Sequence, residues 1–158
     1  MRKTNVMRML EDAGIPYQAL SYEVQDGRLD GMSVAEKTGL LPEEVFKTLV
    51  CRSGNAVYVF IVPVSSELDL KKAAAAAGVK KMEMLKQKDL KRKTSYVHGG
   101  CSPIGMKRLY PSFLDESARG KQAISVSAGK IGTQVRLAPH DLLRMLEGEY
   151  ADLRPSRN

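Results

Sequence analysis

Lys47 interrupts a run of apolar residues, and this placement makes it the first side chain in the sequence with a candidate role in chemistry. A lysine in an apolar strand either extends its ammonium to solvent along its four-carbon stem or holds it against an acceptor in a pocket. The sequence leaves both readings open. The neighbours of Lys47 have types that are typical of a buried strand, namely Val45, Phe46, Leu49 and Val50.

A glycine-rich loop over residues 99–105 offers a second kind of chemistry. It reads Gly99-Gly100-Cys101-Ser102-Pro103-Ile104-Gly105. Three glycines, a proline and a serine are typical of a tight loop with exposed backbone N–H groups. Such groups can approach an oxyanion or a phosphate closely. The lysine and the loop together are more specific than either is alone.

Other side chains with a capacity for acid–base or nucleophilic catalysis are few. His98, beside the glycine-rich loop, is the one candidate imidazole base, whereas His140 is expected on the polar face of a helix. Cys51 and Cys101 are expected to be small buried side chains. The sequence contains no nucleophile elbow, P-loop, dinucleotide-binding fingerprint or metal-ligand cluster. We therefore expect neither a cofactor nor a metal.

Positive charge dominates the chain, with 25 lysines and arginines, 18 acidic residues and a net charge of +7. Nine of the basic residues lie within 71–93, where only Glu83 and Asp89 oppose them. Such a run is either a solvated face or a surface that binds phosphates without reading sequence. The second reading gives four candidate contacts to a nucleic acid: Lys80, Lys81, Arg92 and Lys93.

Short helices are expected to frame these candidates. The capping-box sequence Ser33-Val34-Ala35-Glu36 predicts a helix that begins at Ser33 and ends near Gly39. Apolar spacing, prolines at first positions and glycines beyond the ends predict the others. They cover residues 4–13, a single turn at 42–44, the alanine-rich 69–77, the basic 87–93, and a final helix from Pro139 onward.

Short apolar segments predict about six or seven strands. They lie at 15–22, in a hairpin that carries Lys47 and turns at 53–55 into 56–64, and near 79–85, 109–114, 122–126 and 133–137. Strands without a βαβ rhythm predict an α+β fold with a mixed, largely antiparallel sheet. The chain shows no internal repeat or linker, so we expect one domain over 1–153 and a C-terminal tail at 154–158.

Composition places the chain among ordinary globular proteins. Its 158 residues, 43% hydrophobic and 27% charged, are enough to bury a core. The longest apolar run, 56–64, has the length of a strand and is far short of a membrane span. The first residues lack a signal-peptide pattern, and two cysteines without partner spacing favour a cytoplasmic protein.

Two motifs carry a resemblance to a known family. Phe46-Lys47-Thr48-Leu49, followed by the 99–105 loop, resembles the YbaK/ProX-type aminoacyl-tRNA editing domains, deacylases related to the insertion domain of bacterial prolyl-tRNA synthetase. The 68–74 and 78–84 blocks and Ser127-Ala128-Gly129-Lys130 are similar to the YbaK branch in particular. The resemblance covers nearly the whole chain, and it implies a compact mixed sheet, curved toward a barrel, with helices packed around it.

The resemblance also implies roles for individual residues. Lys47 and the backbone N–H groups of Gly99, Gly100 and Cys101 would position the ester and stabilise its developing charge. Seven other residues match substrate-binding positions: Tyr22, Ser102, Pro103, Ser127, Gly129, Lys130 and Asp141. The chain departs from the family pattern in two places. Ile131-Gly132 replaces a basic residue followed by glycine, and an aromatic residue often expected before the capping-box helix is replaced near Asp30.

The activity implied by the resemblance is cleavage of the ester between an amino acid and the terminal ribose of tRNA. In the YbaK branch the cysteine thiol of the misacylated tRNA would attack its own ester carbonyl, so that the protein need only orient the ester and stabilise charge. The favoured interpretation is a deacylase acting in trans on Cys-tRNA(Pro), with tRNA(Cys) as a further substrate. A ProX-type Ala-tRNA(Pro) deacylase and a non-catalytic tRNA-binding or synthetase-associated module are the alternatives. The sequence does not decide whether prolyl-tRNA synthetase is a partner.

Overall fold

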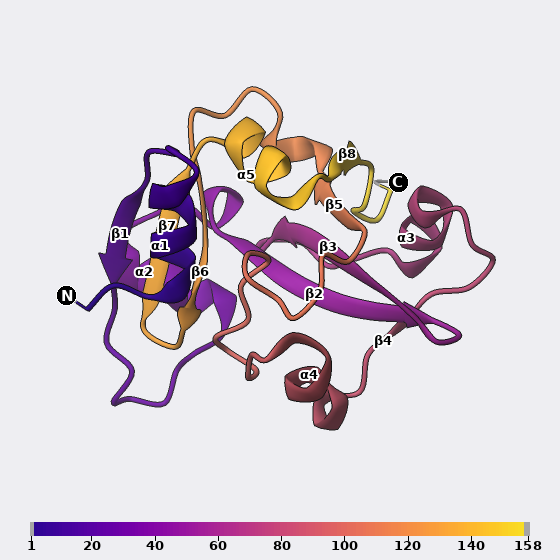
Figure 1. Cartoon of the computed structure of the whole chain (residues 1–158), viewed down its shortest axis with the longest axis horizontal. Coiled ribbons are helices and arrows are strands. Elements are labelled where there is room, and N and C mark those ends of the chain that lie inside the picture. The colour runs from indigo at the N-terminus through magenta and orange to yellow at the C-terminus, as the bar shows by residue number, and fades with distance from the viewer. Residues whose placement is uncertain (1, 157–158) are drawn as a thin grey trace.

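Two β-sheets meet at the centre of the molecule (Figure 1). The structure, a computed structural model, describes residues 2–156, so the last two residues of the expected tail lie outside it. The larger sheet has the strand order β4-β2-β3-β5-β8 and the smaller one β1-β7-β6. The strands are β1 (Gln18–Ser21), β2 (Phe46–Ser53), β3 (Ala56–Pro63), β4 (Glu83–Met84), β5 (Ser112–Asp115), β6 (Ile124–Lys130), β7 (Thr133–Leu137) and β8 (Glu149–Ala151).

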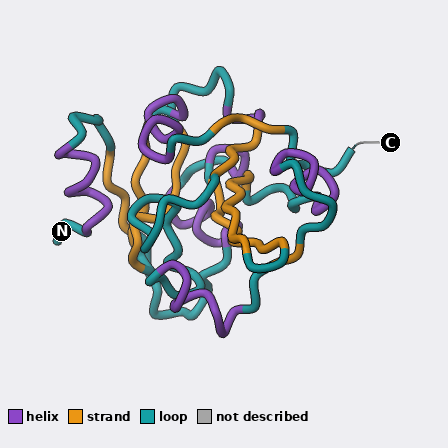
Figure 2. The backbone as a smooth tube through the Cα atoms, turned by 45° about the vertical axis from the view of Figure 1, so that its right-hand side comes forward, coloured by secondary structure: helices purple, strands orange, loops and turns teal. Residues whose placement is uncertain are grey.

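Short helices surround the sheets, as the backbone trace shows (Figure 2). They are α1 (Asn5–Asp12), α2 (Gly31–Thr38), α3 (Leu70–Ala77), α4 (Gln87–Thr94) and α5 (Pro139–Leu146), with 3₁₀ turns η1 (Pro42–Glu44) and η2 (Glu116–Ala118). Pairing is antiparallel for β1–β7, β6–β7, β2–β3 and β2–β4, and parallel for β3–β5 and β5–β8. The predicted α+β fold with a mixed, largely antiparallel sheet is confirmed.

Each sheet buries one face under a helix whose sequence fits that face. Val6, Met7 and Leu10 of α1 pack into the cluster formed around β6 and β7. On the larger sheet, Ala73 and Ala74 of α3 pack against Phe60 and its neighbours. Small side chains let α3 lie close to the strands.

A single parallel bridge between Val45 and Ser125 joins the two sheets. The bridge brings the start of β2 beside β6, so the Lys47 strand and residues 127–130 of β6 come together although they lie far apart in the sequence. A long-range ion pair between Glu44 and Arg136, 2.9 Å apart, lies at the same junction. The junction sets one wall of the site described below.

The start of α2 differs from the prediction. The helix begins at Gly31, and its N-cap is Asp30, whose carboxylate accepts hydrogen bonds from the backbone N–H of Ser33 at 3.2 Å and from its hydroxyl at 2.7 Å. Ser33 therefore lies inside the first turn, because an aspartate three residues earlier already caps the helix. A Cβ atom at Gly31 would collide with Val64, so only glycine allows α2 to begin this close to the strands.

Three other boundaries also differ. The strand predicted over 79–85 reduces to Glu83–Met84, and the one predicted near 109–114 begins at Ser112. The final strand, β8, was missed because it has three residues and lies directly after α5. β6, predicted near 122–126, continues to Lys130 through a bulge, which leaves a two-residue turn at Ile131-Gly132 before β7.

Candidate active site

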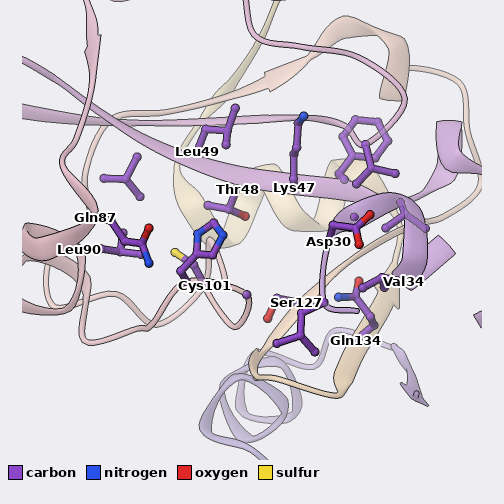
Figure 3. Close-up of a pocket in the computed structure, with 18 of the residues that line it drawn as sticks. Asp30, Val34, Lys47, Thr48, Leu49, Gln87, Leu90, Cys101, Ser127 and Gln134 are labelled. Atoms are coloured by element: carbon purple, nitrogen blue, oxygen red, sulfur yellow. The ribbon is translucent and has the colours of Figure 1, made fainter. Parts of the chain in front are cut away.

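A cavity of about 500 Å³ opens beside β2 and is bounded by the start of α2, α4 and the glycine-rich loop (Figure 3). Its lining is largely apolar, with a few polar groups among the aliphatic side chains. Cavities of this size and character commonly hold small molecules or parts of larger substrates. Five of the predicted site residues line it: Tyr22, Lys47, Gly99, Cys101 and Ser127.

The outer edge of β2 faces this cavity. The N–H of Val64 donates to the carbonyl of Val45 at 2.8 Å, so alternate residues of β2 from Val45 onward point their backbone groups toward β3. Thr48 falls in the other set, and its N–H and C=O point toward the open edge. Among residues 2–156, no strand pairs with that edge between the Val45 bridge and Cys51.

Thr48 also contributes its side chain to the cavity. Its hydroxyl oxygen is buried and has no hydrogen-bond partner within the part of the chain that the structure describes. A buried hydroxyl without a partner costs free energy, which a ligand that bonds to it would recover. Our prediction of site residues missed Thr48, although it stands in the Phe46-Lys47-Thr48-Leu49 motif.

Lys47 also lines the cavity, and its side chain projects from the side of β2 opposite to Thr48. Figure 3 shows Lys47 and Leu49 projecting to one side of the strand, and Thr48 to the other, where Cys101 also lies. The Lys47 ammonium makes no ion pair or hydrogen bond with any described residue. Partial burial lowers its pKa, and the carboxylate of Glu67 partly opposes this shift. The ammonium is thus available to an incoming anion.

The glycine-rich loop presents fewer N–H groups than expected. The N–H of Gly100 donates to the carbonyl of Val97 at 3.0 Å, and a Cβ at Gly100 would approach the Ile131 nitrogen to 3.1 Å. Gly100 is therefore buried under the β6–β7 turn. The N–H groups of Gly99 and Cys101 have no acceptor among residues 2–156, and both residues line the cavity.

The thiol of Cys101 is not activated. Burial raises its pKa to about 12, an effect that a hydrogen bond with Thr94 only partly opposes. Burial likewise raises the pKa of Cys51 to about 12. Both thiols stay protonated near neutral pH, and a protonated thiol is a poor nucleophile. The imidazole of His98 is exposed at the rim of the cavity.

Three of the predicted substrate-binding residues, Ser102 in the loop and Ser127 and Gly129 in β6, shape the backbone. Ser102 is buried, and its hydroxyl accepts a hydrogen bond from the N–H of Ile104 at 3.2 Å. The Ser127 hydroxyl accepts one from the N–H of Gly129 at 3.1 Å. A Cβ at Gly129 would come within 3.0 Å of the Tyr96 ring, so this position requires glycine.

The last three predicted substrate-binding residues lie away from the cavity wall. Pro103 lines a separate hollow beside α1 and α5. Lys130 is exposed at the end of β6. Asp141 is on α5, where its carboxylate lies 3.4 Å from the guanidinium of Arg144. Residues 127–130 of β6 thus contribute to the site chiefly through Ser127.

Polar residues that sequence reasoning did not select complete the wall. Asp30 is the one carboxylate among the described lining residues, and the hydrogen bonds from Ser33 lower its pKa. The side-chain amide oxygen of Gln134 accepts a hydrogen bond from the Ser125 hydroxyl at 2.8 Å. Gln87 and Leu90 of α4 form the far wall. Of these residues, only Asp30 had a signal in the sequence, because an aspartate at that position is a typical N-cap residue of a helix.

The described residues contain no group of three or more side chains suited to hold a metal ion. Within the same residues, every helix is too short or too polar to cross a membrane. The candidate nucleic-acid contacts divide between two places. Arg92 and Lys93 lie on α4, beside the site, whereas Lys80 and Lys81 follow α3.

Comparison with known proteins gives a consistent result. Residues 32–145 match the model of the aminoacyl-tRNA editing domain. A protein of Enterococcus faecalis, whose name assigns it provisionally as a Cys-tRNA(Pro)/Cys-tRNA(Cys) deacylase (EbsC), is 46% identical over 154 residues, which are 96% of this chain and 93% of that protein.

Solved structures show the same fold. One, described provisionally as a trans-editing enzyme for prolyl-tRNA synthetase, has a TM-score of 0.85 at 22% identity and covers 98% of this chain and 100% of its own. Another, of a protein described as hypothetical, has a TM-score of 0.87 at 18% identity and covers 96% and 100%.

Proposed function

This chain belongs to the aminoacyl-tRNA editing domain family, and from that premise we propose that it is an aminoacyl-tRNA deacylase that removes cysteine from mischarged Cys-tRNA(Pro). Cys-tRNA(Cys) is a further substrate in this proposal. The name of the 46% identical relative supports this choice of amino acid and tRNA.

One observation carries the proposal. The cavity contains several polar groups that have no hydrogen-bond or ion-pair partner within the described part of the protein. Among the described residues, it contains no activated nucleophile. The ammonium of Lys47, the hydroxyl of Thr48 and the N–H groups of Gly99 and Cys101 are available to a ligand. Such a site suits a reaction in which the substrate brings its own attacking group and the protein supplies orientation and electrostatic stabilisation.

The cysteinyl ester supplies that attacking group. Its sulphur bonds to the ester carbonyl carbon, and the negative charge on the carbonyl oxygen is stabilised by N–H donors of the glycine-rich loop. The carbon–oxygen bond to the ribose then breaks, and the thiol proton passes to the leaving ribose oxygen. The product is a cyclic thioester, which water opens to free cysteine.

Lys47 and Asp30 each interact with a different charged group of the substrate. The Lys47 ammonium supplies a fixed positive charge for the terminal nucleotide's phosphate or for the reacting carbonyl. The ionised carboxylate of Asp30, held by Ser33, suits the α-ammonium of the amino acid. Two opposite charges lining one cavity would fix the direction in which the ester enters.

Location and partners follow from the same proposal. Cys51 and Cys101 are both free thiols, as is usual in a reducing compartment, and this supports a cytoplasmic enzyme. Prolyl-tRNA synthetase is the partner that would release mischarged tRNA to this enzyme. The description of one structural neighbour as a trans-editing enzyme for that synthetase supports this part of the proposal.

A side-by-side deacylation assay with Cys-, Ala- and Pro-tRNA(Pro) tests the proposal. We expect Cys-tRNA(Pro) to be cleaved fastest and Pro-tRNA(Pro) to survive. Faster loss of alanine would indicate the ProX-type activity. Survival of all three substrates, with binding to tRNA retained, would indicate a non-catalytic tRNA-binding module.

A further inference from the structure

A basic groove runs along the side of α4 that faces away from the candidate active site. Two hollows of about 480 and 380 Å³ lie between α4, the β2–β3 turn and residues 107–111. They share four lining residues, so they form one continuous groove, called the α4 groove here. The shared residues are Asn55, Val57, Arg92 and Lys93.

Positive charge along the α4 groove is largely uncompensated. Asp89 pairs with Arg92 at 3.1 Å, and Glu83 pairs with Arg52 at 3.2 Å. The other basic side chains that line the groove have no carboxylate partner within residues 2–156. They are Lys86, Lys88, Lys93, Lys107 and Arg108. A concave surface of one sign concentrates potential and attracts a polyanion.

The two segments that carry these cations are fixed to one another. The hydroxyl of Tyr110 donates a hydrogen bond to the Lys93 carbonyl at 2.6 Å, which ties the 107–111 segment to the end of α4. The hydroxyl of Thr94 donates to the Leu90 carbonyl at 2.7 Å and accepts from the N–H of Tyr96 at 3.0 Å. The spacing of the cations is therefore built into the fold.

Helix α4 separates the groove from the active-site cavity. Gln87 and Leu90 line the cavity, as Figure 3 shows, whereas Lys88, Arg92 and Lys93 line the groove. A helix with its side chains is about 10–12 Å across. A chain that leaves the cavity over α4 would thus reach the groove within about that distance.

We propose that the α4 groove binds the sugar–phosphate backbone of the acceptor arm of the tRNA whose 3′ end occupies the cavity. This inference rests on the proposed function for the identity of the RNA. It assigns the phosphate contacts to α4 and the 107–111 segment. It removes Lys80 and Lys81, which lie outside the groove, from the set predicted from the sequence.

Two matched triple variants test this assignment. The groove variant carries Lys88→Gln, Lys107→Gln and Arg108→Gln, and the control carries Lys71→Gln, Lys80→Gln and Lys81→Gln. All six side chains are exposed, so both variants lose three surface charges and should fold. Binding is measured with an uncharged hairpin that reproduces the acceptor arm, over a series of salt concentrations.

We expect the groove variant to lose about 2 from the slope of log affinity against log salt, since each lost phosphate contact removes about 0.7–0.9. The control should keep the wild-type slope. Equal losses in both variants, or none in either, would overturn the proposal. Normal RNA binding with loss of prolyl-tRNA synthetase binding would also overturn it, because the groove would then be a protein-docking surface.

A second readout separates this inference from the proposed function. The groove variant should still cleave a cysteinyl ester of the terminal CCA trinucleotide, which occupies only the cavity, but should cleave full-length Cys-tRNA(Pro) with a raised KM. If the wild-type protein cleaves neither ester and still binds the hairpin through the groove, the proposed function fails and the groove assignment stands. Equal loss on both esters would contradict the assignment.

Discussion

Strand β2 and the glycine-rich loop carry the two motifs that first indicated a catalytic role, and they differ in how many of their polar groups have partners within the protein. On β2, the Lys47 ammonium and the Thr48 hydroxyl have no internal partner among the described residues. In the loop, the N–H of Gly100 and the hydroxyl of Ser102 are both used in internal hydrogen bonds. A motif therefore mixes groups kept free for a ligand with groups that hold the backbone in place.

The difference matters because substitutions at the two kinds of group should have different effects on activity and stability. Removing a group that waits for a ligand should lower activity and leave stability unchanged or improved. Removing a group that satisfies a buried partner should lower stability and leave the activity of the folded fraction unchanged. The following substitutions separate these outcomes.

Lys47→Ala should produce the largest effect. Loss of a charge that acts on the transition state typically costs about a hundredfold or more. We expect a loss of this size in kcat/KM for Cys-tRNA(Pro), with the thermal midpoint little changed because the ammonium makes no internal ion pair. Lys47→Arg serves as the matched control, since it keeps the charge. Near-normal turnover by Lys47→Ala would place the lysine outside the site.

Thr48→Val and Ser102→Ala should have opposite effects: the first should lower activity but not stability, and the second should lower stability but not the activity of the folded protein. Valine fills the space of threonine and removes a buried hydroxyl that has no partner, so Thr48→Val should keep or gain about 1 kcal/mol of stability while losing about two- to tenfold in kcat/KM. Ser102→Ala leaves the Ile104 N–H without its acceptor and should cost about 1–3 kcal/mol of stability. Denaturant unfolding and steady-state kinetics on both proteins measure the pair. Equal changes in stability and in kcat/KM for the two variants would contradict the distinction between the two regions.

Lys37→Met should have the smallest effect on turnover. The nearly buried Lys37 ammonium donates to the Glu23 carbonyl at 2.7 Å, to the Asp26 carboxylate at 2.7 Å and to the Arg28 carbonyl at 2.8 Å. It thus holds the segment that leads to Asp30 in the cavity wall. We expect a raised KM with kcat nearly unchanged.

The same variant has a pH signature. Hydrogen bonds from Lys37, which contributes most, and from Arg28 lower the pKa of Asp26 from 3.8 to about 2. A lowered carboxyl pKa stabilises the folded state above the ordinary value, and this contribution is lost as the pH falls through the folded value. The stability difference between wild type and Lys37→Met should therefore be constant above about pH 4 and shrink toward pH 2. A stability difference that stayed constant between about pH 5 and about pH 2 would contradict the Lys37–Asp26 interaction.

Local patterns were enough to predict most of the fold. The alanine run of α3, the hairpin of β2 and β3 and the apolar spacing of α1 each encode their structure within a few residues. β8 was missed because its three residues have no period that a sequence can show. The start of α2 was misplaced because two residues, Asp30 and Ser33, are both good caps, and packing of Gly31 against Val64 selects the first.

The candidate site was predictable only in part, for a different reason. A motif marks which residues matter together, but hydrogen bonds and packing decide which of their groups are free. Nothing local to Gly100 shows that its N–H meets the Val97 carbonyl, or that Ile131 from a distant turn covers it. The role of Thr48 likewise depends on which edge of β2 stays unpaired, and this is a property of the assembled sheets.

The central claim is that the substrate's thiol, and no group of the protein, attacks the ester. The most direct test compares Cys-tRNA(Pro) with tRNA(Pro) charged with serine or 2-aminobutyrate, which are close to cysteine in size. Intramolecular attack is favoured by proximity worth several kcal/mol, so kcat for the thiol-free esters should fall by at least about a hundredfold with KM little changed. The cyclic thioester should appear before free cysteine. Similar kcat values for all three esters would contradict the account and would require a general base in the protein, with His98 at the cavity rim the first residue to change.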